Sequence, residues 1–183
     1  MKALLLVGVN ALGLAVVLLI FSISAPAAQT AASVPGAPLG PADTYFVTQT
    51  SLGTPFQVDS GRLAENKGTT QAIRGYAELM VSSHVAVNNA LLAILKKKAP
   101  VPSPTLLKAA DATMVSTLEH ESGQTLDADY VRGQVNYQRA NTALYEYEIA
   151  NGTDSDLKAF ARETLPKIQD HLARALKLQG VSD

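Results

Sequence analysis

The sequence predicts an all-α protein, built as an up-down bundle of four long helices plus one short helix. Two observations support this fold class. Beyond residue 43, apolar residues recur three and four positions apart, and no stretch alternates in the way that a strand requires. Glycine and proline also interrupt this part of the chain at intervals that suit helices joined by brief connections.

The N-terminal segment is expected to direct export. Lys2 precedes an apolar run that ends near Ile23, and Ala25 and Ala27 supply the small residues of a cleavage site. Residues 1–27 are therefore predicted to be a signal peptide. The alternative is an uncleaved signal anchor, because the apolar run is almost long enough to span a bilayer.

A linker is predicted between this leader and the helices. Residues 28–42 consist largely of alanine, proline, glycine and serine, which offer too little large apolar surface to pack. The helical domain then covers residues 43–183. Because the leader directs the chain out of the cytoplasm, we expect a periplasmic or otherwise exported domain, with an inner-membrane anchor facing the periplasm as the alternative.

The first helix of the domain is predicted over residues 43–67. Asp43 is a favourable N-cap, because its carboxylate can accept a hydrogen bond from a free N–H of the first turn. Gly68 stands just past the last apolar position and suits a C-terminal stop. Pro55 lies inside this segment, so a kink or a break is expected there.

The second helix is predicted to begin near Thr70 and to end at the three lysines 96–98. Their positive charge suits the negative end of the helix dipole. A proline-rich stretch then interrupts the chain. Ser103 followed by Pro104 is a good start for the short third helix, which is expected to stop at Gly123.

The last two helices are predicted from their capping residues. Asp127 can cap a fourth helix, which Gly152 then terminates. The stretch Thr153–Asp156 has the form of a capping box and is expected to open the fifth helix. That helix continues to about Leu178, with Pro166 inside it.

Composition and motifs exclude several classes of function. The chain has 15 Lys and Arg against 16 Asp and Glu, so it lacks the basic balance of a nucleic-acid-binding protein. It has no cysteine, which excludes disulfides and thiolate metal sites. Nucleophile-elbow, phosphate-loop and His-Glu-x-x-His motifs are all missing from the sequence, so we expect a protein that is not an enzyme.

His84 lies within the apolar face of the second predicted helix. That face comprises Ile73, Ala77, Met80, His84, Val87, Leu91 and Ile94. This spacing is the seam that helix bundles bury, so the imidazole is expected to point inward and to require a partner. The favoured interpretation is structural. Pro166 removes the usual donor to the carbonyl of Arg162, and a buried histidine can use such a carbonyl.

The alternative interpretation of His84 is a metal or small-ligand site. Met80 and His84 are four residues apart and therefore share one helix face. With His171 across the bundle, a thioether and two imidazoles form a ligand set that copper can use. Met80 is equally well explained as filling of the seam, because methionine adapts to irregular gaps.

Several stretches together resemble one family. They are "YAELMVSSHVAVNNALLAIL", "LDADYVRGQVNYQ" and "DLKAFARETLPKIQDHLARALKL", and with the leader they are similar to DUF4142 proteins. The resemblance covers nearly all of Tyr45 to Leu178 and implies an exported bacterial protein with a ferritin-like helical domain of unassigned function. It places His84 and His171 on the characteristic histidines of the family. Many relatives carry a third histidine where this sequence has Gln138, so this chain departs from the three-histidine pattern of those relatives.

The ferritin-like fold that this resemblance implies raises the question of a di-iron centre. Such a centre requires Glu-x-x-His pairs on two helices. No glutamate in the chain is followed three residues later by a histidine, so the ligands of a di-iron site are absent from the sequence. A ferritin-like fold therefore does not imply ferritin-like chemistry here.

The expected function follows from these points. We expect an exported, non-enzymatic bundle that binds an envelope partner or a small ligand, without a nucleic acid and without a firm cofactor. The alternative is a metal-binding or redox protein that uses His84, His171 and Met80, with copper as the candidate metal. A module tethered to the membrane by its N-terminus is a third possibility.

Overall fold

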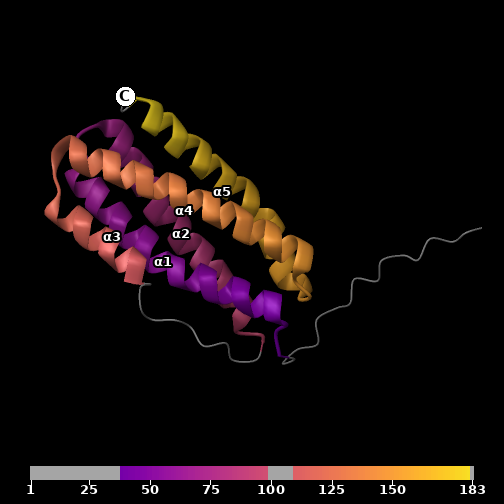
Figure 1. Ribbon diagram of the computed structural model, residues 1–183. Coiled ribbons are helices and arrows are strands. Elements are labelled where there is room, and N and C mark those ends of the chain that lie inside the picture. Colours follow the sequence, from indigo (N-terminus) through magenta and orange to yellow (C-terminus); the bar gives the residue numbers. More distant parts are fainter. Residues whose placement is uncertain (1–37, 99–108, 182–183) are drawn as a thin grey trace, which may run out of the picture.

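The computed structural model describes residues 38–98 and 109–181, and every regular element in these ranges is an α-helix (Figure 1). The helices are α1 (Pro41–Lys67), α2 (Gln71–Leu95), α3 (Ala109–His120), α4 (Gly123–Asn151) and α5 (Ser155–Val181). The predicted all-α fold, with four long helices and one short helix, is thus confirmed. The leader, most of the linker, Ser103 and Pro104 lie outside the described residues.

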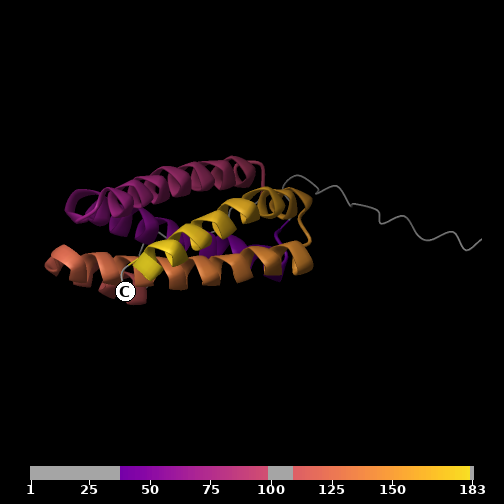
Figure 2. The ribbon, with the colours of Figure 1, turned by 90° about the horizontal axis from the view of Figure 1, so that it is seen from above.

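The four long helices form two antiparallel hairpins, α1 with α2 and α4 with α5, and the short α3 packs beside α1 and α4 (Figures 1 and 2). Thr69 in the α1–α2 turn lies against Asp127 near the start of α4, while Asp43 near the start of α1 contacts Thr153 in the α4–α5 turn. Helices α2 and α4 therefore run parallel. The end of α2 and the start of α4 therefore lie at opposite ends of the bundle, an arrangement shared with bundles that contain one long crossover connection.

The start of α1 corrects the prediction for Asp43. The helix begins at Pro41 with Gly40 as its N-cap, so Asp43 is the third helical residue. Its carboxylate accepts a hydrogen bond from the Gly40 N–H at 3.1 Å and three more from the α4–α5 turn. Two of these come from the N–H and hydroxyl of Thr153, at 3.0 and 2.6 Å, and one from the Asp154 N–H at 3.0 Å. Asp43 thus joins the two hairpins.

Asp127 joins the hairpins at the opposite end, which also corrects its predicted role as an N-cap. Helix α4 begins one turn earlier, at Gly123, whose positive φ of 65° suits a residue without a side chain. The short α3 ends at His120, three residues before the stop predicted at Gly123. The buried carboxylate of Asp127 accepts hydrogen bonds from the N–H and the hydroxyl of Thr69 in the α1–α2 turn.

The start of α5 differs from the predicted capping box. Asp154, rather than Thr153, caps the helix, because its carboxylate accepts hydrogen bonds from the N–H groups of Asp156 and Leu157. Lys98 forms ion pairs with Asp154 and Asp156, each at 2.8 Å, instead of only facing the dipole of its own helix. The glycine stops are as predicted, since Gly68 and Gly152 are the C-caps of α1 and α4.

Both prolines inside helices are accommodated without a break. Pro55 lies within the continuous helix α1, and Pro166 lies within α5. Each proline leaves a carbonyl one turn earlier without its usual donor, which a helix tolerates at a cost of about 3 kcal/mol. A break at Pro55 is therefore wrong, since α1 is continuous and packs against α2 and α4, whereas a kink at this position stays a prediction.

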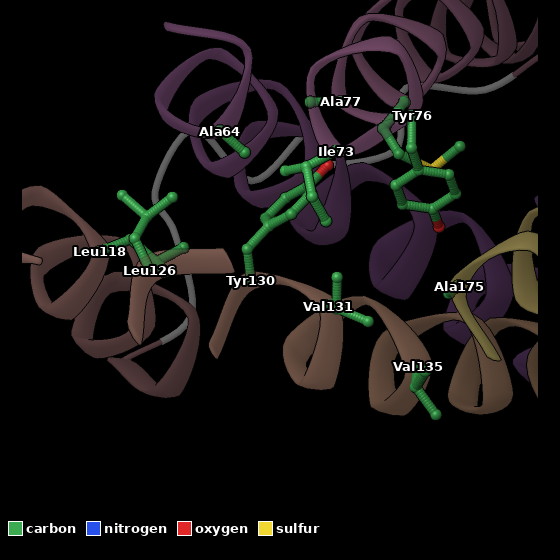
Figure 3. Packing of buried hydrophobic residues seen from close by; sticks show 11 residues of the cluster. Ala64, Ile73, Tyr76, Ala77, Leu118, Leu126, Tyr130, Val131, Val135 and Ala175 are labelled. Carbon is green, nitrogen blue, oxygen red and sulfur yellow. The ribbon is translucent and has the colours of Figure 1, made fainter. Parts of the chain in front are cut away.

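The apolar core is divided into two clusters along the bundle axis. The cluster near the α1–α2 turn, in which side chains of α2 and α4 face each other (Figure 3), comprises Ala64, Ile73, Tyr76, Ala77, Met80, Leu118, Leu126, Tyr130, Val131, Val135 and Ala175. The cluster near the α4–α5 turn comprises Phe46, Val47, Val87, Leu91, Tyr145, Leu157, Phe160, Ala161 and Ile168. Burial of these side chains is the main term that stabilises the bundle.

A second buried carboxyl lies beside Asp43. Glu148 of α4 is fully buried, and a Cβ atom at Gly152 would lie only 2.3 Å from its Oε1. Burial first, and the neighbouring Asp43 carboxylate second, raise the pKa of Glu148 to about 8. Glu148 is therefore protonated in the folded protein at neutral pH.

This raised pKa predicts that stability falls as the pH rises. The folded state holds the Glu148 proton up to about pH 8, whereas the unfolded chain releases it near 4.5, so the stabilisation is complete below 4.5 and is lost between these values. Compared with Glu148→Gln, the wild type should lose up to ~1 kcal/mol of unfolding free energy per pH unit. Urea titrations from pH 5 to 9 test this, with the exposed Glu146→Gln as control. A constant difference would contradict the assignment.

Candidate functional site

Between the two apolar clusters lies a layer of buried polar side chains from all four long helices. We call it the central polar layer, and it comprises Gln57, Ser60, His84, Gln134, Gln138 and His171. On α2, His84 stands between Met80 of one cluster and Val87 of the other. Gln138 on α4 and His171 on α5 likewise lie between a residue of one cluster and a residue of the other. The layer therefore crosses the middle of the bundle.

The two histidines of this layer face each other. Their ring centroids are 5.7 Å apart, and the side chains are only 4% and 3% exposed for His84 and His171, respectively. Among the described residues, neither imidazole is hydrogen-bonded to a backbone carbonyl, so the predicted contact of His84 with the Arg162 carbonyl is wrong. The backbone carbonyl of His171 accepts a hydrogen bond from the hydroxyl of Tyr76 at 3.2 Å, and this bond holds α5 against α2.

Gln138 completes the group around His84. Its amide nitrogen lies 3.4 Å from His84 Nε2, 3.4 Å from Met80 Sδ and 3.4 Å from Gln134 Oε1. Gln134 in turn donates to the hydroxyl of Ser60 at 3.5 Å. The amide thus stands among an imidazole nitrogen, a thioether and an amide oxygen, all of them buried.

Four polar atoms of the layer lack a hydrogen-bond partner among the residues that the structure describes. They are both amide atoms of Gln57, the amide oxygen of Gln138 and Nδ1 of His171. A buried polar atom without a partner costs about 1–3 kcal/mol, and native cores satisfy nearly all such atoms. This part of the core is therefore less favourable for stability than apolar side chains would be. Such a cost is typical of a site that receives a ligand.

Burial keeps both imidazoles neutral. It lowers the pKa of His84 to about 3, with the neighbouring His171 adding to the effect, and it lowers the pKa of His171 to about 4. A neutral imidazole retains a lone pair on one ring nitrogen, which is the form that binds metal ions. At neutral pH the layer thus offers two nitrogen donors, and the sulfur of Met80 lies beside it in the adjoining apolar cluster.

The structure brings together the three candidate residues Met80, His84 and His171 and adds others. The sequence points to Gln138 as a departure from the family pattern, and it does not predict that Gln57 and Gln134 take part. The available signal was a polar residue on an otherwise apolar helical stripe. On α4 that stripe was obscured by many further polar residues.

Comparison with known proteins supports the fold and the family. The sequence pattern of a family described as "Domain of unknown function (DUF4142)" matches residues 25–178. A solved structure, a DUF305 fragment from Deinococcus radiodurans, is similar with a TM-score of 0.69 and 12% sequence identity. That similarity covers 79% of this chain and 99% of the fragment, and it shows the fold alone. Comparison with curated proteins gave no match.

Proposed function

We propose that this chain, which belongs to the DUF4142 family, is an exported, non-enzymatic bundle that binds a copper(I) ion in its central polar layer. His84 and His171 would be the main ligands, with the thioether of Met80 as a third. The observation that carries the proposal is the pair of buried, neutral imidazoles that face each other without carbonyl partners.

The donor set favours a soft ion. Two imidazoles and a thioether suit copper(I), whereas magnesium and calcium prefer oxygen ligands. Among the described residues, no group of three or more histidine or carboxylate side chains could hold a metal. The layer also carries no formal charge, so a singly charged ion costs less to bury here than a divalent one.

The separation of the rings is compatible with one shared ion. When two imidazoles bind one ion with metal–nitrogen bonds of about 2.0 Å, their centroids are roughly 5 to 6 Å apart. The centroids of His84 and His171 are 5.7 Å apart. For His84 Nε2 to bind the ion, Gln138 would have to turn its amide, because the amide nitrogen donates toward that atom. That rotation breaks no hydrogen bond of the Gln138 amide oxygen, which has no partner among the described residues.

Export and the lack of enzymatic activity are supported by the sequence. The leader has the charge, apolar run and small residues of a signal peptide. The sequence lacks nucleophile-elbow, phosphate-loop and His-Glu-x-x-His motifs. A copper(I) carrier or buffer in the periplasm needs neither a second substrate nor a catalytic base.

A second candidate function is the binding of an envelope partner. Tyr45 and Tyr147 are 54% and 45% exposed, and their rings meet edge to face at 6.0 Å. Exposed aromatic side chains are common at protein interfaces. This function needs no ion, so measuring whether copper(I) stabilises the protein separates it from the proposal above.

The proposal predicts that copper(I) stabilises the folded protein. At a free concentration a hundred times the dissociation constant, an ion that binds only the folded state adds about 2.7 kcal/mol. For a chain of this size, the unfolding temperature should rise by about 5–10 °C. The rise should disappear in His84→Ala and in His171→Ala but persist in the control His120→Ala, which changes an exposed histidine of α3. A rise that survives both core substitutions, or no rise in the wild type, would exclude this site.

A further inference from the structure

A surface groove of about 390 Å³ opens among α1, α3 and α4. Its wall on α3 includes Asp111 and Met114, which are three residues apart and therefore share one helix face. Among the described residues that line the groove, Asp111 carries the only formal charge. The groove thus presents a carboxylate and a thioether on one wall.

Tyr137 of α4 separates this groove from the central polar layer. It lines the groove, and its ring meets the ring of His84 edge to face at 6.1 Å. On another side the ring lies against Phe56 at 5.2 Å. The hydroxyl occupies space left by Gly53, where a Cβ atom would lie 1.7 Å from the oxygen. One aromatic ring therefore stands between the groove and His84.

Tyr137 is also less buried than the other side chains around His84. Met80, Gln138 and His171 are buried, whereas Tyr137 is half-buried and borders open space in the groove. A ring that turned into this space would uncover His84 without moving a helix. Rotations of single side chains are faster than movements of whole helices.

Met114 is placed to meet an ion before it reaches Tyr137. Its methyl group lies against Gly133, where a Cβ atom would be 2.5 Å from Cε. Gly133 is one turn before Tyr137 on α4, and both residues line the groove. Thioether sulfur is a good ligand for copper(I), and the carboxylate of Asp111 attracts any cation to the same wall.

We propose that this groove is the access route of the copper(I) ion, with Met114 as an outer binding residue and Tyr137 as a movable screen in front of His84. The inference rests on the proposed function of the central polar layer. It assigns Met114 and Tyr137 to the rate of binding, and it leaves the affinity to His84 and His171.

The test compares rates with affinity in the purified protein. Copper(I) is delivered from a chromophoric chelator in a stopped-flow instrument, and competition with the same chelator gives the equilibrium affinity. Met114→Leu should slow both association and dissociation by about tenfold, because loss of an intermediate binding residue raises the barrier in both directions. Tyr137→Ala should accelerate both rates by a similar factor. Tyr147→Ala, which removes an exposed tyrosine from the same helix, should change neither rate.

The outcomes separate the route from the site. If the wild type binds copper(I) through the two histidines but Met114→Leu and Tyr137→Ala leave its rates unchanged, the access route is wrong and the site stands. If Met114→Leu weakens the equilibrium affinity as much as His84→Ala does, Met114 is a ligand of the final site, which also overturns the inference. If the wild type shows no binding, both the function and the route fail. Met114→Leu conserves size and shape, so its result remains usable if Tyr137→Ala does not fold.

Discussion

Replacing Asp43 with alanine is expected to lower the unfolding free energy by about 3–5 kcal/mol, since a buried carboxylate with several charge-assisted hydrogen bonds would be lost. Asp43 is fully buried and accepts hydrogen bonds from Gly40, Thr153 and Asp154. Hydrogen bonding lowers the pKa of its carboxyl even though burial, the largest influence, acts in the opposite direction. The substitution leaves two backbone N–H groups of the α4–α5 turn without an acceptor.

Urea unfolding at pH 6 measures this loss. Glu65→Ala removes an exposed carboxylate from the same helix and should change stability by less than about 0.5 kcal/mol. Asp43→Asn is the more conservative variant, since it keeps the volume and one acceptor oxygen and should lie between the two. A loss from Asp43→Ala no larger than that from Glu65→Ala would mean that Asp43 does not join the hairpins.

Replacing Gln138 with histidine is expected to add a zinc site to the bundle. The amide of Gln138 already lies 3.4 Å from both His84 Nε2 and Met80 Sδ. A third imidazole at this position, with His84 and His171, gives the three-nitrogen ligand set that zinc accepts. The wild type offers zinc only two nitrogens, so its response to zinc should be weak.

The measurement is the unfolding temperature with and without zinc. At a zinc concentration a hundred times the dissociation constant, the unfolding temperature of Gln138→His should rise by about 5–10 °C. The added ring also fills more of a packed core, which should cost the metal-free variant about 1–3 kcal/mol. Gln124→His, at an exposed position on the same helix, controls for nonspecific binding. If zinc stabilises this control as much as Gln138→His, the new histidine does not join the buried pair.

The helices could be predicted from the sequence more reliably than their N-terminal caps. Gly68 and Gly152 end their helices as expected, although both have negative φ values and leave room for close neighbours, Ile73 and Glu148, instead of forming left-handed caps. The sequence predicts Asp43 and Asp127 as N-caps of their own helices, yet their carboxylates bind the turn of the opposite hairpin. Local patterns do not show a partner that is about a hundred residues away, as Thr153 is from Asp43.

The inward direction of His84 could also be predicted, because it follows from helical periodicity on one segment. Its neighbours could not, since they depend on how far α4 and α5 are shifted along the bundle axis relative to α2. The structure sets that shift so that Gln138 and His171 lie level with His84. The preferred partner, the carbonyl of Arg162, lies nine residues before His171 in the sequence of α5, more than two helical turns away.

X-ray absorption spectroscopy of the copper(I)-loaded protein tests the central claim most directly, because it identifies the ligand atoms of the ion. The account predicts two nitrogen neighbours at about 2.0 Å and one sulfur neighbour at about 2.3 Å, distances typical of imidazole and sulfur ligands of a metal. In Met80→Leu the sulfur contribution should vanish, and in His84→Ala the nitrogen contribution should fall. A spectrum without sulfur, or one that neither substitution changes, would contradict a copper site in the central polar layer.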